Sequence, residues 1–254
     1  MKNIPNLFTL LNLFFGCLAI VFVLQNGIVI HYDFDGSQFV DIPEKIWMAS
    51  LFIGLAGVID FLDGFVARLL NASSEMGKQL DSLADVVSFG VAPSMIVYQF
   101  LRMSFATAEG GIEVSLILLM PAFIIAMAAA YRLAKFNLDT TQSKVFKGMP
   151  TPAVGLFIAS FPLIYWTCDD YSILFFLINK WFWYVIIISI SWLMVSNIPM
   201  FSLKINFKNK QELFPLILLF VIGIVSCIFL KWIAVPILFL SYIILSLLNK
   251  KKLS

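Results

Sequence analysis

The sequence predicts an all-α polytopic membrane protein, on three observations. Of the 254 residues, 61% are hydrophobic and only 13% are charged, which is more apolar surface than a soluble domain of this size can bury. The mean hydropathy is +0.96. Several apolar stretches also reach the length of roughly 20 residues that a membrane-spanning helix needs. A membrane is therefore expected to be the solvent for much of this chain.

Eight apolar stretches are expected to be membrane-spanning helices. They lie at about residues 7–25, 46–70, 80–104, 114–136, 152–167, 175–197, 213–230 and 232–248. The fifth is short. The last two are separated mainly by Lys231 and Trp232, so they form either a tight hairpin or one long bent helix. No small-x-small cleavage site follows the first run, which favours a retained helix over a removed signal peptide.

The basic residues indicate the orientation, because cytoplasmic loops of membrane proteins carry an excess of lysine and arginine. With a cytoplasmic N-terminus, all but four of the 17 lysines and arginines fall on the cytoplasmic side, the four being Lys45, Arg102, Lys180 and Lys231. This bias predicts that both termini lie in the cytoplasm of a cell whose inner membrane holds the chain.

Composition also argues against other classes of function. The net charge of +2 and the lack of a basic stretch interleaved with aromatics argue against nucleic-acid binding. Cys17, Cys168 and Cys227 are far apart and show no metal-ligand spacing. His31 stands in a polar stretch without a cluster of partners. We see no linker or second soluble domain.

Four aspartates stand where the second and third predicted helices approach each other. In the second helix, Asp60, Asp63, Gly64 and Ala67 follow the spacing i, i+3, i+4, i+7, which is one helix face. In the third, Gly77, Asp81 and Asp85 are four residues apart and again share a face. The short turn between the helices makes them antiparallel neighbours. The aspartates are therefore expected to form one site near the cytoplasmic surface.

Such a cluster calls for compensation of its charge. Four facing carboxylates repel one another unless they are protonated or neutralised. Oxygen ligands suit hard cations such as Mg²⁺, Mn²⁺ or Ca²⁺, and two ions side by side form a clamp used in phosphoryl transfer. Two alternatives stay open at this point: solvated residues at helix ends, and a cation pathway in a transporter.

The spacing of these residues resembles the signature of the CDP-alcohol phosphotransferase family. All eight fixed positions are present, namely Asp60, Asp63, Gly64, Ala67, Arg68, Gly77, Asp81 and Asp85. The resemblance implies transfer of a phosphatidyl or related group from a CDP-linked donor to an alcohol, with release of CMP. It also implies a core of six transmembrane helices, usually in a homodimer.

Four further segments resemble the bacterial-type phosphatidylserine synthases of that family: residues 4–13, 88–93, 132–137 and 146–152. The sequence has Lys135 where arginine is expected and Met149 where leucine is expected. The resemblance covers roughly residues 4–205. It implies a family domain at 1–205 and two additional C-terminal transmembrane helices at 206–254.

Carried over position by position, the resemblance implies a role for each site residue. Asp60, Asp63 and Asp81 are expected to bind the metal, two ions of Mg²⁺ or Mn²⁺. Asp85 is expected to be a ligand or neighbour of the metal and the general base. The expected donor-binding residues for CDP-diacylglycerol are Gly64, Ala67, Gly77 and, at its phosphates, Arg68.

The acceptor is expected to be L-serine, with glycerol 3-phosphate or an inositol phosphate as alternatives. Arg132, Lys135 and Asn137 are expected to bind the acceptor or a phosphate, although Arg132 and Lys135 are also consistent with a role in topology or contact with lipid headgroups. For Thr9 and Asn12, contact with the active site and hydrogen bonding between helices both stay open.

Overall fold

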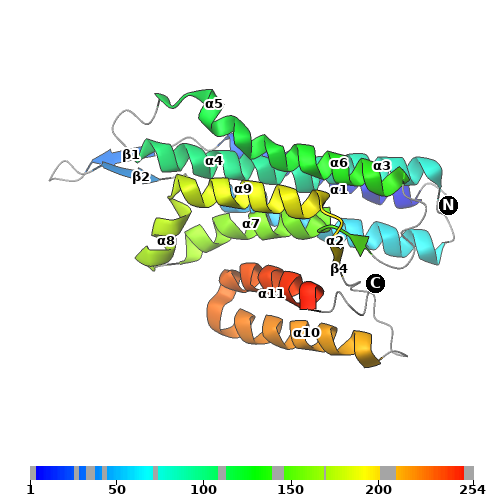
Figure 1. Ribbon diagram of the computed structural model, residues 1–254. Coiled ribbons are helices and arrows are strands. Elements are labelled where there is room, and N and C mark those ends of the chain that lie inside the picture. The colour runs from blue at the N-terminus through cyan, green and yellow to red at the C-terminus, as the bar shows by residue number, and fades with distance from the viewer. Residues whose placement is uncertain are drawn as a thin grey trace.

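The computed structural model describes residues 4–25, 29–32, 38–41, 45–70, 74–107, 113–138, 146–168, 170–200 and 210–248. Within these ranges the chain is a bundle of long helices that run roughly parallel or antiparallel to one another (Figure 1). Many large apolar side chains on the outside of the bundle are exposed, among them Phe61, Ile117 and Phe229. A lipid environment accounts for such a surface.

The first half of the bundle contains α1 (Ile4–Leu24), α2 (Ile46–Leu69), α3 (Glu75–Asp85), α4 (Ala92–Ala106), α5 (Leu116–Leu119) and α6 (Ile124–Leu138). A π-helical turn, η1 (Val86–Val91), joins α3 to α4, and a 3₁₀ turn at Met120–Phe123 joins α5 to α6. The second half contains α7 (Thr151–Thr167), α8 (Tyr171–Leu177), α9 (Lys180–Val195), α10 (Lys210–Leu230) and α11 (Ala234–Leu248), with a 3₁₀ turn at Lys231–Ile233.

Two small antiparallel sheets accompany the helices. One pairs β1 (Val29–Tyr32) with β2 (Gln38–Asp41), with Val29 opposite Asp41. The other pairs β3 (Phe146–Lys147) with β4 (Pro199–Met200) and so ties the start of α7 to the end of α9. The sequence did not predict either sheet.

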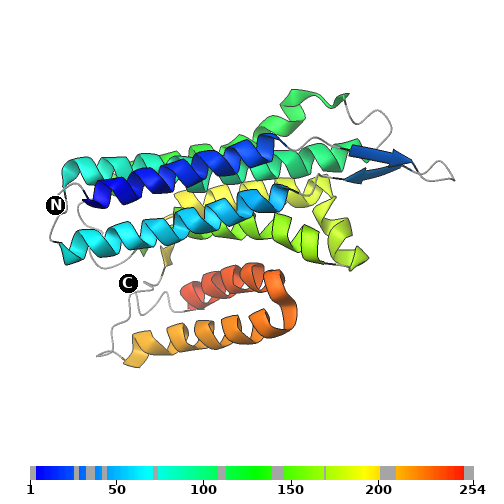
Figure 2. The ribbon, with the colours of Figure 1, turned by 180° about the vertical axis from the view of Figure 1, so that it is seen from behind.

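By length and composition, five helical runs of the described chain are able to cross a membrane, or six if the bent pair α8–α9 counts as one span. The count is below the predicted eight because α7 has only 17 residues, and because α10 and α11 are joined by helical backbone and form one run. The protein is a multi-pass membrane protein. Of the alternatives for the last two stretches, the hairpin is found, since α10 and α11 pack side by side in opposite directions (Figure 2).

One predicted boundary and one predicted continuous helix differ from the structure for local reasons. The third helix begins at Glu75 rather than near residue 80, because the Ser74 side chain caps it by accepting from the Gly77 amide at 3.0 Å. The sixth stretch is not one helix. It bends by 63° between α8 and α9, where Asn179 accepts from the Trp181 amide and starts a new helix. A run of apolar residues does not reveal such a bend.

The turn η1 packs against α1, α6 and α7 and continues directly from α3. Ser88 donates a hydrogen bond to the Asn12 carbonyl of α1 at 3.0 Å, and Gly16 lies against Ser88. Gly155 of α7 faces Phe89, which is fully buried. Since a π-helical turn shifts the helix register, the packing of η1 influences which face α3 presents to its neighbour α1.

We expect Gly155→Ala to destabilise the protein by about 1–3 kcal/mol, because the added methyl group overpacks the helix contact. A Cβ at Gly155 would lie 2.8 to 3.0 Å from Phe89 atoms, including the Cα. The midpoint of thermal unfolding in detergent measures the effect. Gly54→Ala in α2 is the matched control, since nothing lies within 4 Å of its added Cβ. Equal midpoints for the two variants would contradict this packing.

Candidate active site

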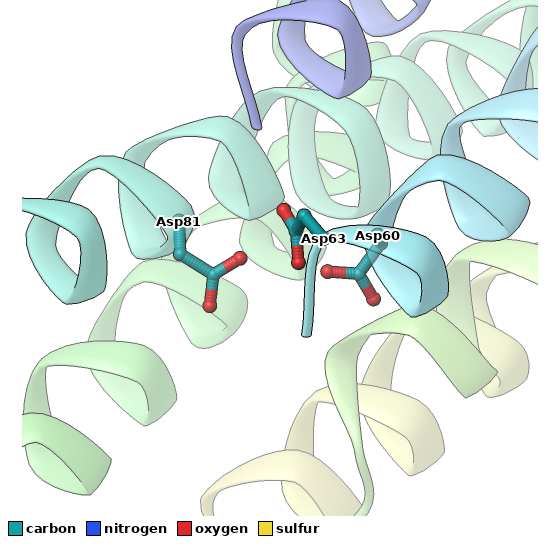
Figure 3. A group of neighbouring side chains, drawn as sticks. All are labelled: Asp60, Asp63 and Asp81. Carbon is teal, nitrogen blue, oxygen red and sulfur yellow. The ribbon is translucent and has the colours of Figure 1, made fainter. Parts of the chain in front are cut away.

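Three carboxylates gather between α2 and α3. Asp60 and Asp63 come from the C-terminal half of α2, and Asp81 comes from α3. One oxygen from each lies within 4.8 Å of the other two, and the three side chains point toward one another (Figure 3). Asp63 is only 7% exposed, and Asp60 and Asp81 are partly buried. The helix faces predicted from the sequence therefore do meet.

The donor set fits a divalent cation. Each carboxylate supplies hard oxygen ligands, which Mg²⁺, Mn²⁺ and Ca²⁺ prefer. The buried Oδ1 of Asp81 has no hydrogen-bond partner in the described part of the chain. A buried carboxylate oxygen without a donor is costly, and a bound cation would compensate for it. The cluster is consistent with a divalent metal site.

Asp85 lies next to this group of three. It lies one helical turn beyond Asp81, is 6% exposed, and accepts a hydrogen bond from Asn12 Nδ2 at 3.3 Å. The sequence placed all four aspartates in one cluster. The structure brings oxygens of three of them within 4.8 Å of one another, and Asp85 lies close enough to interact electrostatically with all three. Asp85 lines a second cavity together with Asp81.

Helix α1 supplies polar partners to the aspartates. Thr9 Oγ1 donates to Asp63 Oδ2 at 2.9 Å, while Asn12 donates to Asp85. Thr9 is 4% exposed and Asn12 is fully buried, so both bonds are shielded from solvent. Hydrogen bonding between helices and contact with the site are therefore the same interaction for Thr9 and Asn12, because both bonds end on the aspartates.

A first cavity of about 230 Å³ opens beside Asp63 and Asp81. The small residues of the signature line it, together with α1 residues and the start of α3: Pro5, Asn6, Thr9, Asp63, Gly64, Ala67, Ser74, Gly77, Lys78 and Asp81. At Gly77 a Cβ would lie 3.0 Å from the Asn6 side chain and would narrow this space. Arg68 is exposed and is not among the lining residues. The small signature residues thus make room next to the carboxylates.

A second cavity of about 200 Å³ adjoins Asp85. Its lining residues come from α3, α6 and the start of α7: Lys78, Asp81, Ser82, Asp85, Arg132, Leu133, Phe136, Asn137, Pro150 and Pro152. Arg132 is 9% exposed; its Nη1 donates to Thr151 Oγ1 at 2.9 Å, and its buried Nε has no partner in the described residues. A buried guanidinium with an unused donor suits an anionic group in this cavity.

Of the remaining predicted acceptor residues, one lines the second cavity and the other does not. Asn137 lines the second cavity and donates from Nδ2 to Ser82 Oγ at 2.8 Å. Lys135 is not among the lining residues of either cavity, and its ammonium donates to Asn197 Oδ1 at 2.7 Å.

Sequence reasoning missed Lys78, which it used only for orientation. Lys78 lines both cavities and donates from Nζ to the Asn137 carbonyl at 3.3 Å. Its position three residues before Asp81, on the same helix face, is the signal that points to it.

Comparison with known proteins points to one family. The sequence model of the family described as CDP-alcohol phosphatidyltransferase matches residues 2–195, which include every site residue named above. A CDP-diacylglycerol–serine O-phosphatidyltransferase of Helicobacter pylori (strain ATCC 700392 / 26695) is 34% identical over 218 residues, 85% of this chain and 78% of the relative. An enzyme of the same name from Bacillus subtilis (strain 168) is 35% identical over 156 residues, which is 61% of this chain and 73% of the relative. Another from Saccharomyces cerevisiae (strain ATCC 204508 / S288c) is 37% identical over 153 residues, which is 57% of this chain and 48% of the relative. The chain belongs to the CDP-alcohol phosphatidyltransferase family.

Proposed function

We propose that the chain transfers the phosphatidyl group of CDP-diacylglycerol to the hydroxyl of L-serine, forming phosphatidylserine and CMP. The observation that carries this proposal is the pair of cavities that meet at Asp81. One contains the small residues beside the three carboxylates, and the other contains Asp85 and Arg132. The serine-specific names of its relatives supply the acceptor.

The first cavity receives the CDP group of the donor. Gly64, Ala67 and Gly77 leave space for it, and Arg68 at the exposed end of α2 reaches the donor phosphates. Asp60, Asp63 and Asp81 hold the metal, two ions of Mg²⁺ or Mn²⁺, which when bound neutralises the pyrophosphate and the CMP leaving group. Thr9 orients Asp63 through its hydrogen bond, as outer partners of metal ligands do.

The second cavity receives serine. Arg132 and Asn137 bind its carboxylate, and Lys135 adds positive charge nearby. Asp85 accepts the proton of the serine hydroxyl as its oxygen forms the new bond to phosphorus. The bond from phosphorus to the CMP oxygen breaks, and CMP leaves with the electron pair. We infer direct attack, because the hydroxyls that line the two cavities are engaged in other hydrogen bonds. Thr9 donates to Asp63, Ser74 caps α3, and Ser82 donates to the Lys78 carbonyl.

An alcohol panel tests this function. Purified protein in detergent–lipid micelles receives CDP-diacylglycerol, Mg²⁺ or Mn²⁺, and one alcohol at a time. CMP release with serine alone is the expected result. Release only with glycerol 3-phosphate or an inositol phosphate would assign another acceptor. Absence of release with every alcohol, in folded protein, would refute the transferase; metal flux into vesicles would then favour a cation transporter.

We further propose that the site and both termini face the cytoplasm. The support is the lysine and arginine bias together with the fold, since the ends of α2 and α6 and the starts of α3 and α7 lie at one end of the bundle (Figure 1). The predicted cytoplasmic residues Lys2, Lys144, Lys204, Lys208 and Lys250 to Lys252 lie outside the described residues.

Labelling of single-cysteine variants checks this orientation. In a chain without Cys17, Cys168 and Cys227, we expect Glu75→Cys to react with a membrane-impermeant maleimide only in inverted inner-membrane vesicles. Asp170→Cys, at the other end of the bundle, is expected to react only in right-side-out vesicles. The opposite pattern would reverse the topology.

Two broader features are also proposals. The family domain spans residues 1–205, and α10–α11 forms the C-terminal addition at 206–254, supported by a family match that ends at residue 195. The hairpin packs on the family core, since Phe239 of α11 stacks on Phe157 of α7 with ring centroids 4.2 Å apart. A homodimer follows only from the family resemblance, and the mass of the protein–detergent complex tests it.

A further inference from the structure

Lys78 occupies the boundary between the two cavities. Of all the residues that line them, only Lys78 and Asp81 line both. The two stand three residues apart on α3 and therefore share one face of that helix. A cation and a metal-binding carboxylate thus lie side by side where the cavities meet.

The proposed reaction places the phosphorus at this boundary. In a phosphoryl transfer the attacking and leaving oxygens lie roughly in line, on opposite sides of the phosphorus. If the nucleotide fills the first cavity and serine enters the second, the transferred phosphorus lies between them. The residues common to both cavities are then its nearest neighbours.

The resting contacts of Lys78 leave donors for such a group. Its Nζ donates to the carbonyl of Asn137 at 3.3 Å, in the last turn of α6, where carbonyls lack helical partners. An ammonium group has three donors, and this is its one hydrogen bond within the described residues. Capping of α6 accounts for that bond but not for the position between the cavities.

We propose that Lys78 is a catalytic residue that donates to the non-bridging oxygens of the phosphoryl group during transfer. This inference rests on the transferase function proposed above. Charge on these oxygens develops as the bond to CMP breaks, and a preorganised cation stabilises it. Asp60, Asp63 and Asp81 would hold the metal, and Lys78 supplies positive charge at the boundary between the two cavities.

Three substitutions separate catalysis from capping. Lys78→Gln keeps a donor for the Asn137 carbonyl but removes the charge, Lys78→Arg keeps the charge, and Lys78→Met removes both. We expect Lys78→Gln and Lys78→Met to lower kcat for CMP release by about 10²-fold, the usual effect of losing one transition-state donor, with KM for serine nearly unchanged. Lys78→Arg is expected to retain more activity than either.

The control is Lys180→Gln, which removes a lysine charge at the far end of the bundle, where Nζ lies 4.9 Å from the Phe105 ring centroid. It is expected to leave kcat unchanged. Thermal unfolding of each variant identifies any that fail to fold. Because Lys78→Gln and Lys78→Met both remove the charge, the test still stands if one of the two does not fold. If Lys78→Gln keeps wild-type kcat, the lysine only caps α6 and the proposal is overturned. If KM for serine rises while kcat holds, the lysine binds the acceptor instead, which also overturns it.

Failure of the proposed transferase function can be distinguished from failure of the proposed role of Lys78. If the wild-type chain releases CMP only with another alcohol, the same ratio of kcat values with that alcohol decides the role of Lys78. If the folded wild-type chain releases no CMP with any alcohol, both proposals are refuted together.

Discussion

Asp85→Asn is expected to lower the rate of CMP release by about 10³-fold, within the range measured for general-base catalysis. Asparagine keeps the shape and the contact with Asn12 but cannot accept the serine proton. The change is measured as kcat at saturating CDP-diacylglycerol, serine and Mn²⁺. Mn²⁺ is held at saturation because Asp85 lies beside the three convergent carboxylates, so that weaker metal binding does not enter the measured kcat.

Asp170→Asn is the control for this substitution. Asp170 caps α8 by accepting from the Ser172 amide at 2.8 Å, and asparagine caps a helix about as well. It is far from the site and is expected to leave kcat unchanged. A rate for Asp85→Asn within tenfold of wild type would exclude its role as the base.

Asp81→Asn is expected to have a comparable effect through a different cause. It removes one of the three convergent carboxylates and replaces an unpartnered buried oxygen with an amide. We expect kcat to fall at least about 10²-fold, since metal-ion catalysis contributes several kcal/mol and each 1.36 kcal/mol is a factor of ten. The metal concentration needed for half-maximal activity is expected to rise, which Mn²⁺ titration measures.

A control variant and a chelation measurement accompany this experiment. Glu75→Gln changes an exposed acidic residue in the first turn of the same helix and is expected to leave the metal requirement unchanged. EDTA is expected to stop CMP release by the wild-type chain, and added Mg²⁺ or Mn²⁺ to restore it. Activity that survives EDTA would show that the carboxylates act without a metal.

The sequence predicted the central pair of helices well, because its signal is strictly local. Helical periodicity alone places Asp60 and Asp63 on one face of α2 and Asp81 on one face of α3. A short connection makes the two helices neighbours. Periodicity does not give the rotation or depth of each side chain, however, so it could not show which carboxylate oxygens come within 4.8 Å of one another.

Residues that reach the site from distant helices were harder to predict. Thr9 donates to Asp63 across 54 positions of sequence, and Lys78 reaches the end of α6 across 59. Apolar runs show that these helices exist, but they do not show which faces of them meet. An apolar run also does not show where a helix is interrupted, so the bend at the Asn179 cap in the sixth stretch was not predicted.

The sequence by itself determined that this is a helical membrane protein, that its carboxylates belong to a CDP-alcohol phosphatidyltransferase signature and suit a divalent metal, and which helices carry them. Composition, helical period and fixed spacing are properties of the chain alone. Only the tertiary structure decided that three aspartates converge while the fourth lines a second cavity, and that Arg132 faces that cavity. The position of Lys78 between the two cavities likewise appeared only in the tertiary structure. These facts depend on how the helices rotate and pack against one another, which long-range contacts fix.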